Sequence, residues 1–318
     1  MNLPTSIIEA LSSLPQGLRQ EDMIRDAQSL SHAYRSQNAS GMRLVTVQAQ
    51  AVAYAAARMP ATFCAVTTAL QHALDCTRAS IRTVIDAGAG TGAASWAAST
   101  LLALDNILCL EREPAMRSVG QVLMQSGNEV LKNAAWQGCD LATDTVTDSA
   151  DLVIMGYVLN EMARDSRVTV LKKLWNAASH MLLIVEPGTP AGYANLMDAR
   201  TCLLGMGAHM AAPCPHEKQC PMTDNDWCHF SCRVQRTKLH KQLKGGEAGY
   251  EDEKFSYMAF VRDAANPVQA RILRHPQVHK GHVTLTLCCE DGIRKQTISK
   301  KDGEMYKLSR DAAAGGSI

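Results

Sequence analysis

An aspartate followed by three glycines at alternate positions is the stretch of this sequence best suited to holding a ligand. It reads Asp86-x-Gly88-x-Gly90-x-Gly92, after a β-branched run and ahead of a helical stretch. Glycines let a backbone turn sharply and approach a ligand without interference from a Cβ atom. The helix that follows adds oriented amides and the positive end of a dipole, which suit an anionic group. The motif therefore predicts a cofactor site between a strand and a helix.

Two kinds of cofactor fit this loop. The pattern Gly88-x-Gly90-x-x-Ala93 satisfies the loose fingerprint of a nicotinamide or flavin site. An acid two residues before the first glycine, and a helical extension ahead of the strand, favour S-adenosylmethionine. Glu111 lies nineteen residues beyond Gly92, at the end of the next predicted strand, where a carboxylate can accept both ribose hydroxyls. We therefore expect S-adenosylmethionine, with Glu111 as its ribose ligand.

The next two predicted strands should complete the cofactor site. We expect Asp140 and Leu141 near the adenine, and the turn that begins at Tyr157 beneath the sulfonium. Enzymes that methylate exocyclic base amines typically carry Asn/Asp-Pro-Pro-aromatic at this turn, whereas this chain has Asn160-Glu161-Met. Asn160 and Glu161 are the best-placed polar groups for catalysis, and they fit equally well as a helix cap and a surface carboxylate. These residues do not specify the methyl acceptor.

A second group that could do chemistry is a run of cysteines. The chain has eleven cysteines, and in a reducing compartment clustered thiols indicate a metal or cofactor site rather than disulfides. The spacing Cys214-x5-Cys220-x7-Cys228 lacks the paired Cys-x2-Cys knuckles of a zinc ribbon. Thiolate ligation of an iron–sulfur cluster fits at least as well, with zinc as the alternative.

The fourth thiol of such a site is open on spacing alone. If residues 227–234 form a strand, Cys228 and Cys232 lie about 13 Å apart at ~3.3 Å per residue, which is too far for one compact cluster. A ligand from Cys288 or Cys289, at the end of a later strand, closes the site better.

Basic residues gather in the last third of the chain. Between Arg233 and Arg310 there are sixteen Lys or Arg and nine Asp or Glu, whereas the rest of the chain has sixteen and twenty-two. Charge runs are often only solvated faces, but a basic end on an acidic body favours a polyanionic partner. We expect RNA to bind Arg233, Arg236, Lys238, Lys241, Lys244, Arg271, Arg274 and Lys280, with Arg294, Lys295, Lys300 and Lys301 in support.

The elements that must position these residues follow from the hydrophobic pattern. From Arg82 onward, short apolar runs alternate with helical stretches, which is typical of a doubly wound α/β sheet. Buried parallel strands are expected at residues 83–86, 107–110, 152–155 and 182–185, with helices at 93–104, 114–124 and 166–178. Further strands are expected at 227–234, at 254–261 (with Phe255 and Tyr257 packed inward) and between 271 and 299.

The expected fold class is α/β, a Rossmann-like class I S-adenosylmethionine-dependent methyltransferase fold. We divide it into a helical N-terminal region (1–80), the cofactor-binding domain (81–210), a Cys-rich insert with the last sheet strands (211–265) and a basic β-rich extension (266–318). Pro60 is expected to separate two helices in the first region. A short helix is expected from Asp302, followed by frayed residues 312–318.

Neither a secretory nor a transit peptide is apparent at the N-terminus, so a cytoplasmic location is the default expectation. No apolar run approaches the roughly 20 residues that a membrane helix needs, so we expect no membrane partner.

At this point the sequence resembles a known family: the methyltransferase-like proteins associated with small-ribosomal-subunit assembly, shared by bacteria and mitochondria. The match runs from about Leu30 to Arg310. The residues that carry it are Asp86–Gly92, Val185-Glu-Pro-Gly-Thr189, Cys214-Pro-His-Glu217, Asp226-Trp-Cys-His-Phe230 and the block from Lys244 to Tyr257.

The resemblance implies a four-cysteine cluster, [4Fe–4S], with zinc as the alternative metal. Its ligands would be Cys214, Cys220, Cys228 and Cys288, with Cys289 as the spare; Cys232 does not match the family pattern. His216 is expected beside the cluster rather than on it.

The resemblance also implies small-subunit rRNA as the partner and a monomer away from the ribosome. Two functions are compatible with it: an rRNA methyltransferase, or an assembly factor that binds S-adenosylmethionine and rRNA without methyl transfer.

Overall fold

The structure is a computed structural model that describes residues 3–15, 17–35, 44–223, 225–244 and 248–318. Its helices are α1 (Thr5–Ser13), α2 (Gln20–Arg35), α3 (Gln48–Leu74), α4 (Ala93–Leu101), α5 (Pro114–Met124), α6 (Glu129–Lys132), α7 (Arg164–Ala177), α8 (Pro190–Leu204), α9 (Lys238–Lys244) and α10 (Glu304–Asp311). Two 3-10 turns are η2 (Leu159–Glu161) and η3 (Lys300–Asp302).

Twelve strands lie in the part of the chain that the structure describes. The first six are β1 (Thr83–Ala87), β2 (Asn106–Leu110), β3 (Ala135–Gln137), β4 (Ala150–Gly156), β5 (Ala178–Pro187) and β6 (His209–Ala212). The remaining six are β7 (Phe230–Gln235), β8 (Tyr250–Val261), β9 (Ala270–Ile272), β10 (Gln277–His279), β11 (His282–Cys289) and β12 (Gly292–Ser299).

The main sheet has the order β3-β2-β1-β4-β5-β8-β6, and β7 also pairs with β8. Strands β1 to β5 pair in parallel, whereas β8 runs antiparallel to β5, β6 and β7. This is the predicted Rossmann-like class I S-adenosylmethionine-dependent methyltransferase fold. The chain order reverses between β1 and β4, and in open α/β sheets ligands bind beyond the carboxyl ends of the strands at such a point.

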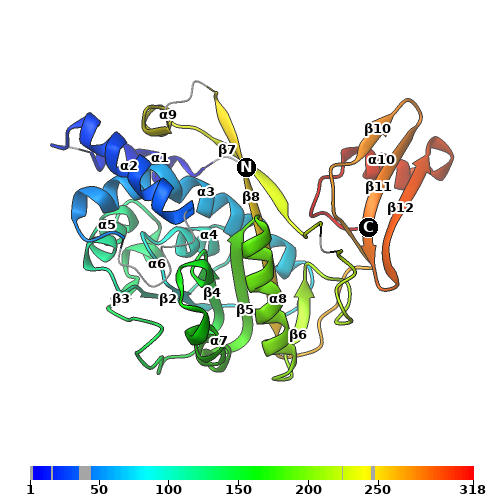
Figure 1. The fold of residues 1–318 in the computed structure, drawn as a ribbon, viewed down its shortest axis with the longest axis horizontal. Helices are drawn as coiled ribbons and strands as arrows, with labels where there is room; N and C mark the ends of the chain where they lie inside the picture. Colours follow the sequence, from blue (N-terminus) through cyan, green and yellow to red (C-terminus); the bar gives the residue numbers. More distant parts are fainter. Residues whose placement is uncertain (1–2, 16, 36–43, 224, 245–247) are drawn as a thin grey trace.

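Helices cover both faces of the main sheet (Figure 1). Alternate residues of each strand point to opposite faces. On β4, for example, Leu152 and Ile154 join the core under α3, α4 and α5, and Val153 and Met155 join the core under α7 and α8. The helices of the N-terminal region therefore belong to the core on one face of the main sheet.

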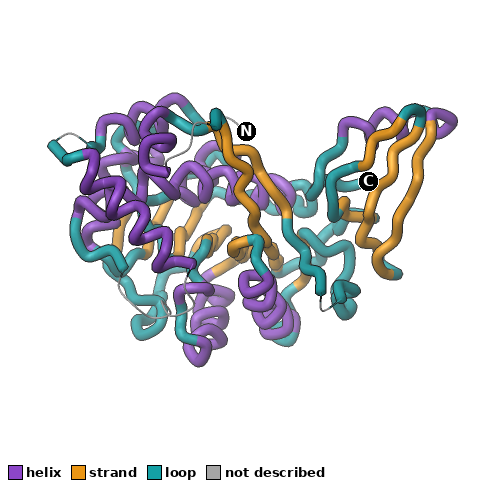
Figure 2. Tube along the Cα trace, turned by 45° about the horizontal axis from the view of Figure 1, so that its top comes forward, coloured by secondary structure: helices purple, strands orange, loops and turns teal. Residues whose placement is uncertain are grey.

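A second, four-stranded antiparallel sheet is formed by β9 to β12 and carries α10 on one face. Figures 1 and 2 place it at one end of the molecule and α1 and α2 at the other. No helix among the described residues is both long and apolar enough to cross a membrane.

Two expectations about elements are wrong. Pro60 does not separate two helices, because it lies inside α3, a single helix of 27 residues. Proline removes one backbone donor, but burial of α3 against the sheet outweighs that local preference. Residues 312–318 are not frayed either. Ile318 exchanges two backbone hydrogen bonds with Ala270 of β9, the Gly316 carbonyl accepts from Ile272, and Gly315 donates to the Ile272 carbonyl.

Candidate cofactor and metal sites

The glycine loop connects β1 to α4 at the point where the sheet order reverses. Gly88, Gly90 and Gly92 have φ angles of 74°, 56° and 86°, a left-handed conformation that side chains rarely adopt. A Cβ atom on Gly88 would also lie 2.6 Å from Val158 Cγ2. Glycine is therefore required by backbone conformation at all three positions, and by space at Gly88.

Two buried carboxyl groups hold the loop in place. Asp86 accepts hydrogen bonds from the backbone and hydroxyl of Ser95, at 2.9 and 2.8 Å, and burial raises its pKa to about 6. Glu111 accepts the N–H groups of Gly90 and Glu113, both at 2.8 Å, and burial also raises its pKa. The predicted ribose ligand is thus already fixed against the glycine loop.

Asp140 and Leu141 lie next to Glu111, beyond the end of β3. The backbone N–H of Cys139 donates to the Glu111 carbonyl at 3.4 Å, and Asp140 lies 3.9 Å from the guanidinium of Arg112. Leu141 is buried, and Asp140 caps its own turn by accepting from Ala142 at 3.0 Å. The structure therefore brings these residues to the same edge of the sheet as the glycine loop.

The long helix α3 contributes groups that the sequence analysis missed. Tyr54 lies about 4 Å from the position of a Cβ on Gly90. One turn later, Arg58 forms an ion pair with Glu253 at 3.3 Å. Tyr157, the one described non-glycine residue with a positive φ (65°), donates its hydroxyl to the same Glu253 at 3.0 Å. The Tyr157 side chain is thus committed to α3 and β8.

The carboxyl group of Glu186 binds the turn after β4. The sequence analysis did not single out this residue. Glu186 is fully buried and accepts hydrogen bonds from Leu159 N at 3.0 Å and Asn195 Nδ2 at 3.5 Å. Burial raises its pKa to about 8. Burial and the nearby charge of Glu111 raise the pKa of Glu161 to about 8 as well. The only signal for Glu186 in the sequence was its place in the Val185–Thr189 block of the resemblance.

These residues fit S-adenosylmethionine. The left-handed glycines leave an open backbone before the α4 N-terminus, where a carboxylate is favoured. A carboxylate has about four acceptor sites, and Glu111 uses two of them within the chain, which leaves capacity for ribose hydroxyls.

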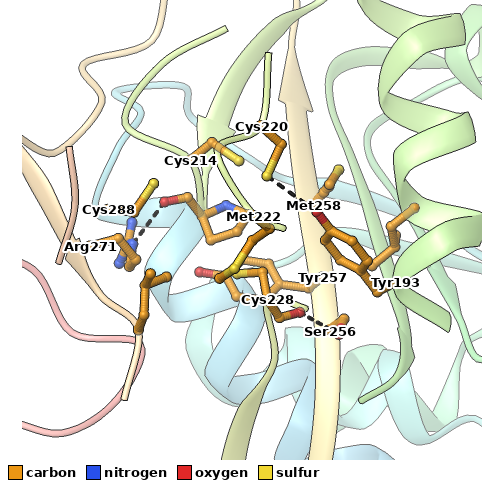
Figure 3. A pocket seen from close by; sticks show the side chains of 13 residues that line it. Tyr193, Cys214, Cys220, Met222, Cys228, Ser256, Tyr257, Met258, Arg271 and Cys288 are labelled. Carbon is orange, nitrogen blue, oxygen red and sulfur yellow. Dashed lines mark hydrogen bonds between the residues drawn. The ribbon is translucent and has the colours of Figure 1, made fainter. Parts of the chain in front are cut away.

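The second site is a cavity that we call the cysteine cavity, lined by Cys214, Cys220, Cys228 and Cys288 (Figure 3). Three of the thiols come from the connection between β6 and β7, and the fourth, Cys288, comes from β11. Empty space between its walls, including the opening, amounts to about 450 Å³. The other lining groups are largely apolar and comprise Tyr193, Leu196, Pro213, Met222, Ser256, Tyr257, Met258, Arg271 and Leu273.

The four thiols line the same cavity, but they do not lie close enough together to coordinate one metal ion. Among the described residues, no three His, Cys, Asp or Glu side chains converge closely enough to hold a metal ion. Burial raises the pKa of Cys214 to about 11 and of Cys288 to about 12. The cavity nevertheless offers four cysteine thiols, and its other lining groups are largely apolar. Four thiols are the donor set of a thiolate-ligated metal group, so the residues present fit one.

The structure separates the three candidates for the fourth thiol. Cys288 and Cys289 alternate on β11, so Cys288 faces the cavity while Cys289 packs in the core under α10. Cys232, on β7, lies instead beside Cys64 of α3, whose thiol is 3.6 Å from the Arg233 carbonyl. His216 Nε2 lies 3.9 Å from Cys288 Sγ. Cys288 is thus the C-terminal cysteine at the cavity.

The residues expected to bind RNA do not form one free basic face. Arg233 pairs with Asp252, Arg236 with Glu251 and Arg274 with Asp226, at 2.5 to 2.9 Å. Arg271 is only 2% exposed and cannot reach a partner outside the chain. Lys241 is partly exposed and Lys280 is exposed, while the side chains of Lys238 and Lys244 lie outside the described part of the structure.

Comparison with known proteins identifies the family. A family model described as mitochondrial small ribosomal subunit Rsm22 matches residues 48–318. The chain belongs to the Rsm22 family. This agrees with the resemblance seen in the sequence, and the match covers the glycine loop, the cysteine cavity and the small sheet.

Two individual relatives of this Rsm22-family chain are each less than 30% identical to it. It is 28% identical over 324 residues to the human ribosome assembly protein METTL17, mitochondrial, covering 93% of this chain and 68% of that protein. It is 26% identical over 216 residues to an Rsm22-cox11 tandem protein, mitochondrial, of Schizosaccharomyces pombe, of which it spans only 29%.

Solved structures with a similar fold include two methyltransferases. Magnesium protoporphyrin IX methyltransferase from Synechocystis, with bound S-adenosylmethionine, has a TM-score of 0.41 at 15% identity, covering 78% of this chain and 99% of that one. The N-methyltransferase NodS from Bradyrhizobium japonicum, with S-adenosyl-L-homocysteine, has a TM-score of 0.38 at 9% identity, covering 62% and 84%.

The relatives correct one expectation. A cytoplasmic location, expected by default, is wrong in the light of these names, because the curated relatives are mitochondrial proteins. The expectation rested on the N-terminal residues, where no signal or transit peptide is apparent, and that pattern does not decide the location of the protein.

Proposed function

We propose that this chain binds S-adenosylmethionine and a [4Fe–4S] cluster and acts on the small ribosomal subunit as an rRNA methyltransferase during ribosome biogenesis. The observation that carries the proposal is the glycine loop together with Glu111, embedded in a chain of the Rsm22 family. A relative named as a ribosome assembly protein supports the ribosomal role.

The residues at the loop would act by binding and orientation. S-adenosylmethionine supplies an electrophilic methyl group when it is bound. Gly88, Gly90 and Gly92 would receive its methionine part at the α4 N-terminus, and Glu111 would accept the ribose hydroxyls. The Leu159–Glu161 turn would then face the acceptor. Transfer from a sulfonium needs little beyond an aligned nucleophile, so fixing this turn through Glu186 supports catalysis by positioning.

An assembly factor without methyl transfer is the second candidate. It is favoured by the Asn160-Glu161-Met turn, which lacks the Pro-Pro-aromatic that holds a base amine in many nucleic-acid methyltransferases. Asn160 makes no side-chain hydrogen bond to another described residue, so its amide is free for either role.

The two candidates are separated by transfer of labelled methyl groups. The chain would be given the labelled donor with small-subunit particles and with naked rRNA. Label in rRNA, lost in an Asn160→Ala variant that still binds the donor, supports the methyltransferase. Donor binding without incorporation leaves the assembly factor.

The cluster has its own test. The chain purified without oxygen should be brown, with a broad visible absorption band and about four irons per chain. Replacing Cys288 by Ser should remove this band, whereas Cys289→Ser and Cys232→Ser should retain it. A colourless chain with one tightly held zinc would show that the cavity is a zinc site.

For the rRNA contact we propose the exposed lysines of the small sheet in place of Arg271. Lys280, Lys295, Lys300 and Lys301 are exposed, and none forms an ion pair with another described residue. The chain is proposed to be a monomer away from the ribosome, which its sedimentation would test.

A further inference from the structure

Two arginines are buried beside the cysteine cavity. Arg200, on α8, is 6% exposed, and Arg271, on β9, is 2% exposed. Arg271 lines the cavity, and it lies directly opposite Cys288 in the pairing of β9 with β11, so the two side chains share one face of the small sheet. In Figure 3 the guanidinium of Arg271 lies near Cys288 at the cavity wall.

Both guanidinium groups bind backbone carbonyls around the loop that carries the cysteines. Arg271 donates to Pro213 O at 2.9 Å and, from its other side, to Gly315 O at 2.8 Å. Arg200 donates to the carbonyls of His216 and Lys218, at 3.3 and 2.7 Å. The loop between Cys214 and Cys220 is thus held between α8 and β9 by two cations.

The carbonyl acceptors are neutral, so they do not balance the positive charges of Arg200 and Arg271. In the described part of the chain, neither arginine forms an ion pair with a carboxylate. Arg200 Nε and His216 Nδ1 are buried without a hydrogen-bond partner there. Burying a cation without an anion is energetically unfavourable. Two such cations beside an apolar cavity indicate that the cavity is built for a negatively charged occupant.

A thiolate-ligated metal group has the required charge. Each coordinating cysteine is deprotonated, so four of them bring four negative charges, which the positive charge of an iron–sulfide core only partly cancels. We propose that Arg200 and Arg271 are the counter-charges of the cysteine cavity, which retain an anionic thiolate-ligated cluster and hold its reduction potential high. This inference rests on the proposed cluster.

The effect on the potential follows from electrostatics. Reduction adds one negative charge to the cluster, and a fixed cation nearby stabilises that added charge. Nearby charge, together with hydrogen bonds and burial, is one of the means by which a protein sets the potential of an iron–sulfur cluster. The two arginines would thus act on the cluster through their positive charge, and not as its ligands.

The competing explanation is that both arginines only brace the loop by binding carbonyls. Arg262 offers a matched control because it does this elsewhere: it donates to Ala178 O at 3.0 Å and to Trp175 O at 2.5 Å, and it stacks on the Trp175 ring. A bracing role alone would change stability without changing the potential.

The experiment uses the full chain purified without oxygen as Arg200→Gln, Arg271→Gln, Arg200→Lys, Arg271→Lys and Arg262→Gln variants. Iron and sulfide per chain, the rate at which a chelator removes iron, and the midpoint potential from a redox titration would be measured. At the wild-type midpoint potential we expect each Gln variant to hold about tenfold less reduced relative to oxidised cluster, a shift of about 59 mV for one electron. The Lys variants should keep most of the wild-type potential, and Arg262→Gln all of it.

The outcomes separate this inference from the proposed function. Gln variants that keep the cluster at the wild-type potential overturn the inference and leave the cluster standing. If the Gln variants lose their iron, the Lys variants decide: retained iron supports the counter-charge role, and equal loss shows a bracing role. A wild-type chain that holds neither iron nor zinc overturns the cluster, and the inference with it.

Discussion

Burial changes the ionisation of several carboxyl groups in this chain. Asp86, Glu161 and Glu186 are carboxyl groups that burial holds closer to their neutral form, with pKa values raised to about 6, 8 and 8. All three lie around the proposed donor site, where a bound sulfonium would favour their ionised form. A raised pKa in the folded state has a consequence for stability that can be measured.

The first prediction concerns Glu186 and pH. Its pKa is about 8 in the folded chain, against 4.5 for an ordinary glutamate. Between these values the folded state keeps a proton that the unfolded state releases, so its protonated form is favoured at low pH and stability is lost as pH rises. The free energy of unfolding should fall from pH 5 to 8, by at most about 1.4 kcal/mol per pH unit from this group.

Urea unfolding at several pH values would check this. Glu186→Gln, which removes the titrating group, should make the fall shallower, and Glu129→Gln at an exposed site of α6 serves as the control. Parallel pH profiles for wild type and Glu186→Gln would contradict the prediction.

The second prediction concerns Gly88. Replacement by alanine would place a Cβ 2.6 Å from Val158 Cγ2, in a left-handed conformation that costs roughly 1–2 kcal/mol. Calorimetry should show binding of the donor weakened about tenfold or more, because the loop must move. Gly281 has a similar φ of 91° with nothing within 4 Å, so Gly281→Ala should lower stability and leave donor affinity unchanged. Equal donor affinity in both variants would count against the loop as the binding site.

At the scale of elements, two segments have roles that local propensity does not show. Helix α3 contacts both the sheet and the cofactor loop, and brings Tyr54 and Arg58 to the site. The end of the chain adds to the small sheet, and its Gly315 carbonyl accepts from Arg271. Helix α3 and the C-terminal residues therefore complete the two sites.

The third prediction concerns those C-terminal residues. Ending the chain at Asp311 removes four backbone hydrogen bonds with β9, each worth about 0.5–1.5 kcal/mol, and one acceptor of Arg271. The melting temperature should fall, and iron should be lost faster to a chelator. Ile318→Ser, which keeps the backbone pairing, should have a smaller effect. A truncated chain as stable as the full one would mean that these residues are not part of the fold in solution.

At the scale of the whole molecule, charge is distributed unevenly. The net charge is only +1, yet the last third is basic and the remainder acidic. Much of that basic charge is used internally, as in the Arg233–Asp252 and Arg236–Glu251 pairs. The exposed remainder includes the lysines of the small sheet, which lies at the opposite end of the molecule from α1 and α2 (Figure 1).

The fourth prediction concerns rRNA binding through those lysines. Changing Lys280, Lys295, Lys300 and Lys301 to Gln should weaken binding to rRNA and flatten its dependence on salt, by about 0.7–0.9 in logarithmic slope for each phosphate that is no longer neutralised. Filter binding at several salt concentrations would measure both. Arg82→Gln, at an exposed ion pair on the acidic body, is the control. An unchanged salt slope in the lysine variant would place the RNA surface elsewhere.

The main fold was predictable because its signals are local. The strands β1, β2, β4 and β5 are short apolar runs, and the turn after β1 is marked by glycines that no other residue replaces without strain. The continuation of α3 through Pro60 was not predictable in this way, since it depends on the sheet against which the helix packs. The same is true of the paired C-terminal residues, whose partner, β9, lies 43 to 48 residues earlier.

By itself, the sequence determined the glycine loop, the alternation of strands and helices, and the set of cysteines with which a cluster could be built, because spacing along the chain carries that information. Only the tertiary structure decided that Cys288 faces the cavity while Cys289 turns away, that Glu186 lies beneath the Leu159 turn, and that Arg271 is buried at the cavity instead of exposed to RNA. Burial and charge balance arise between residues distant in sequence. They depend on which faces pack together, and therefore on the folded chain as a whole.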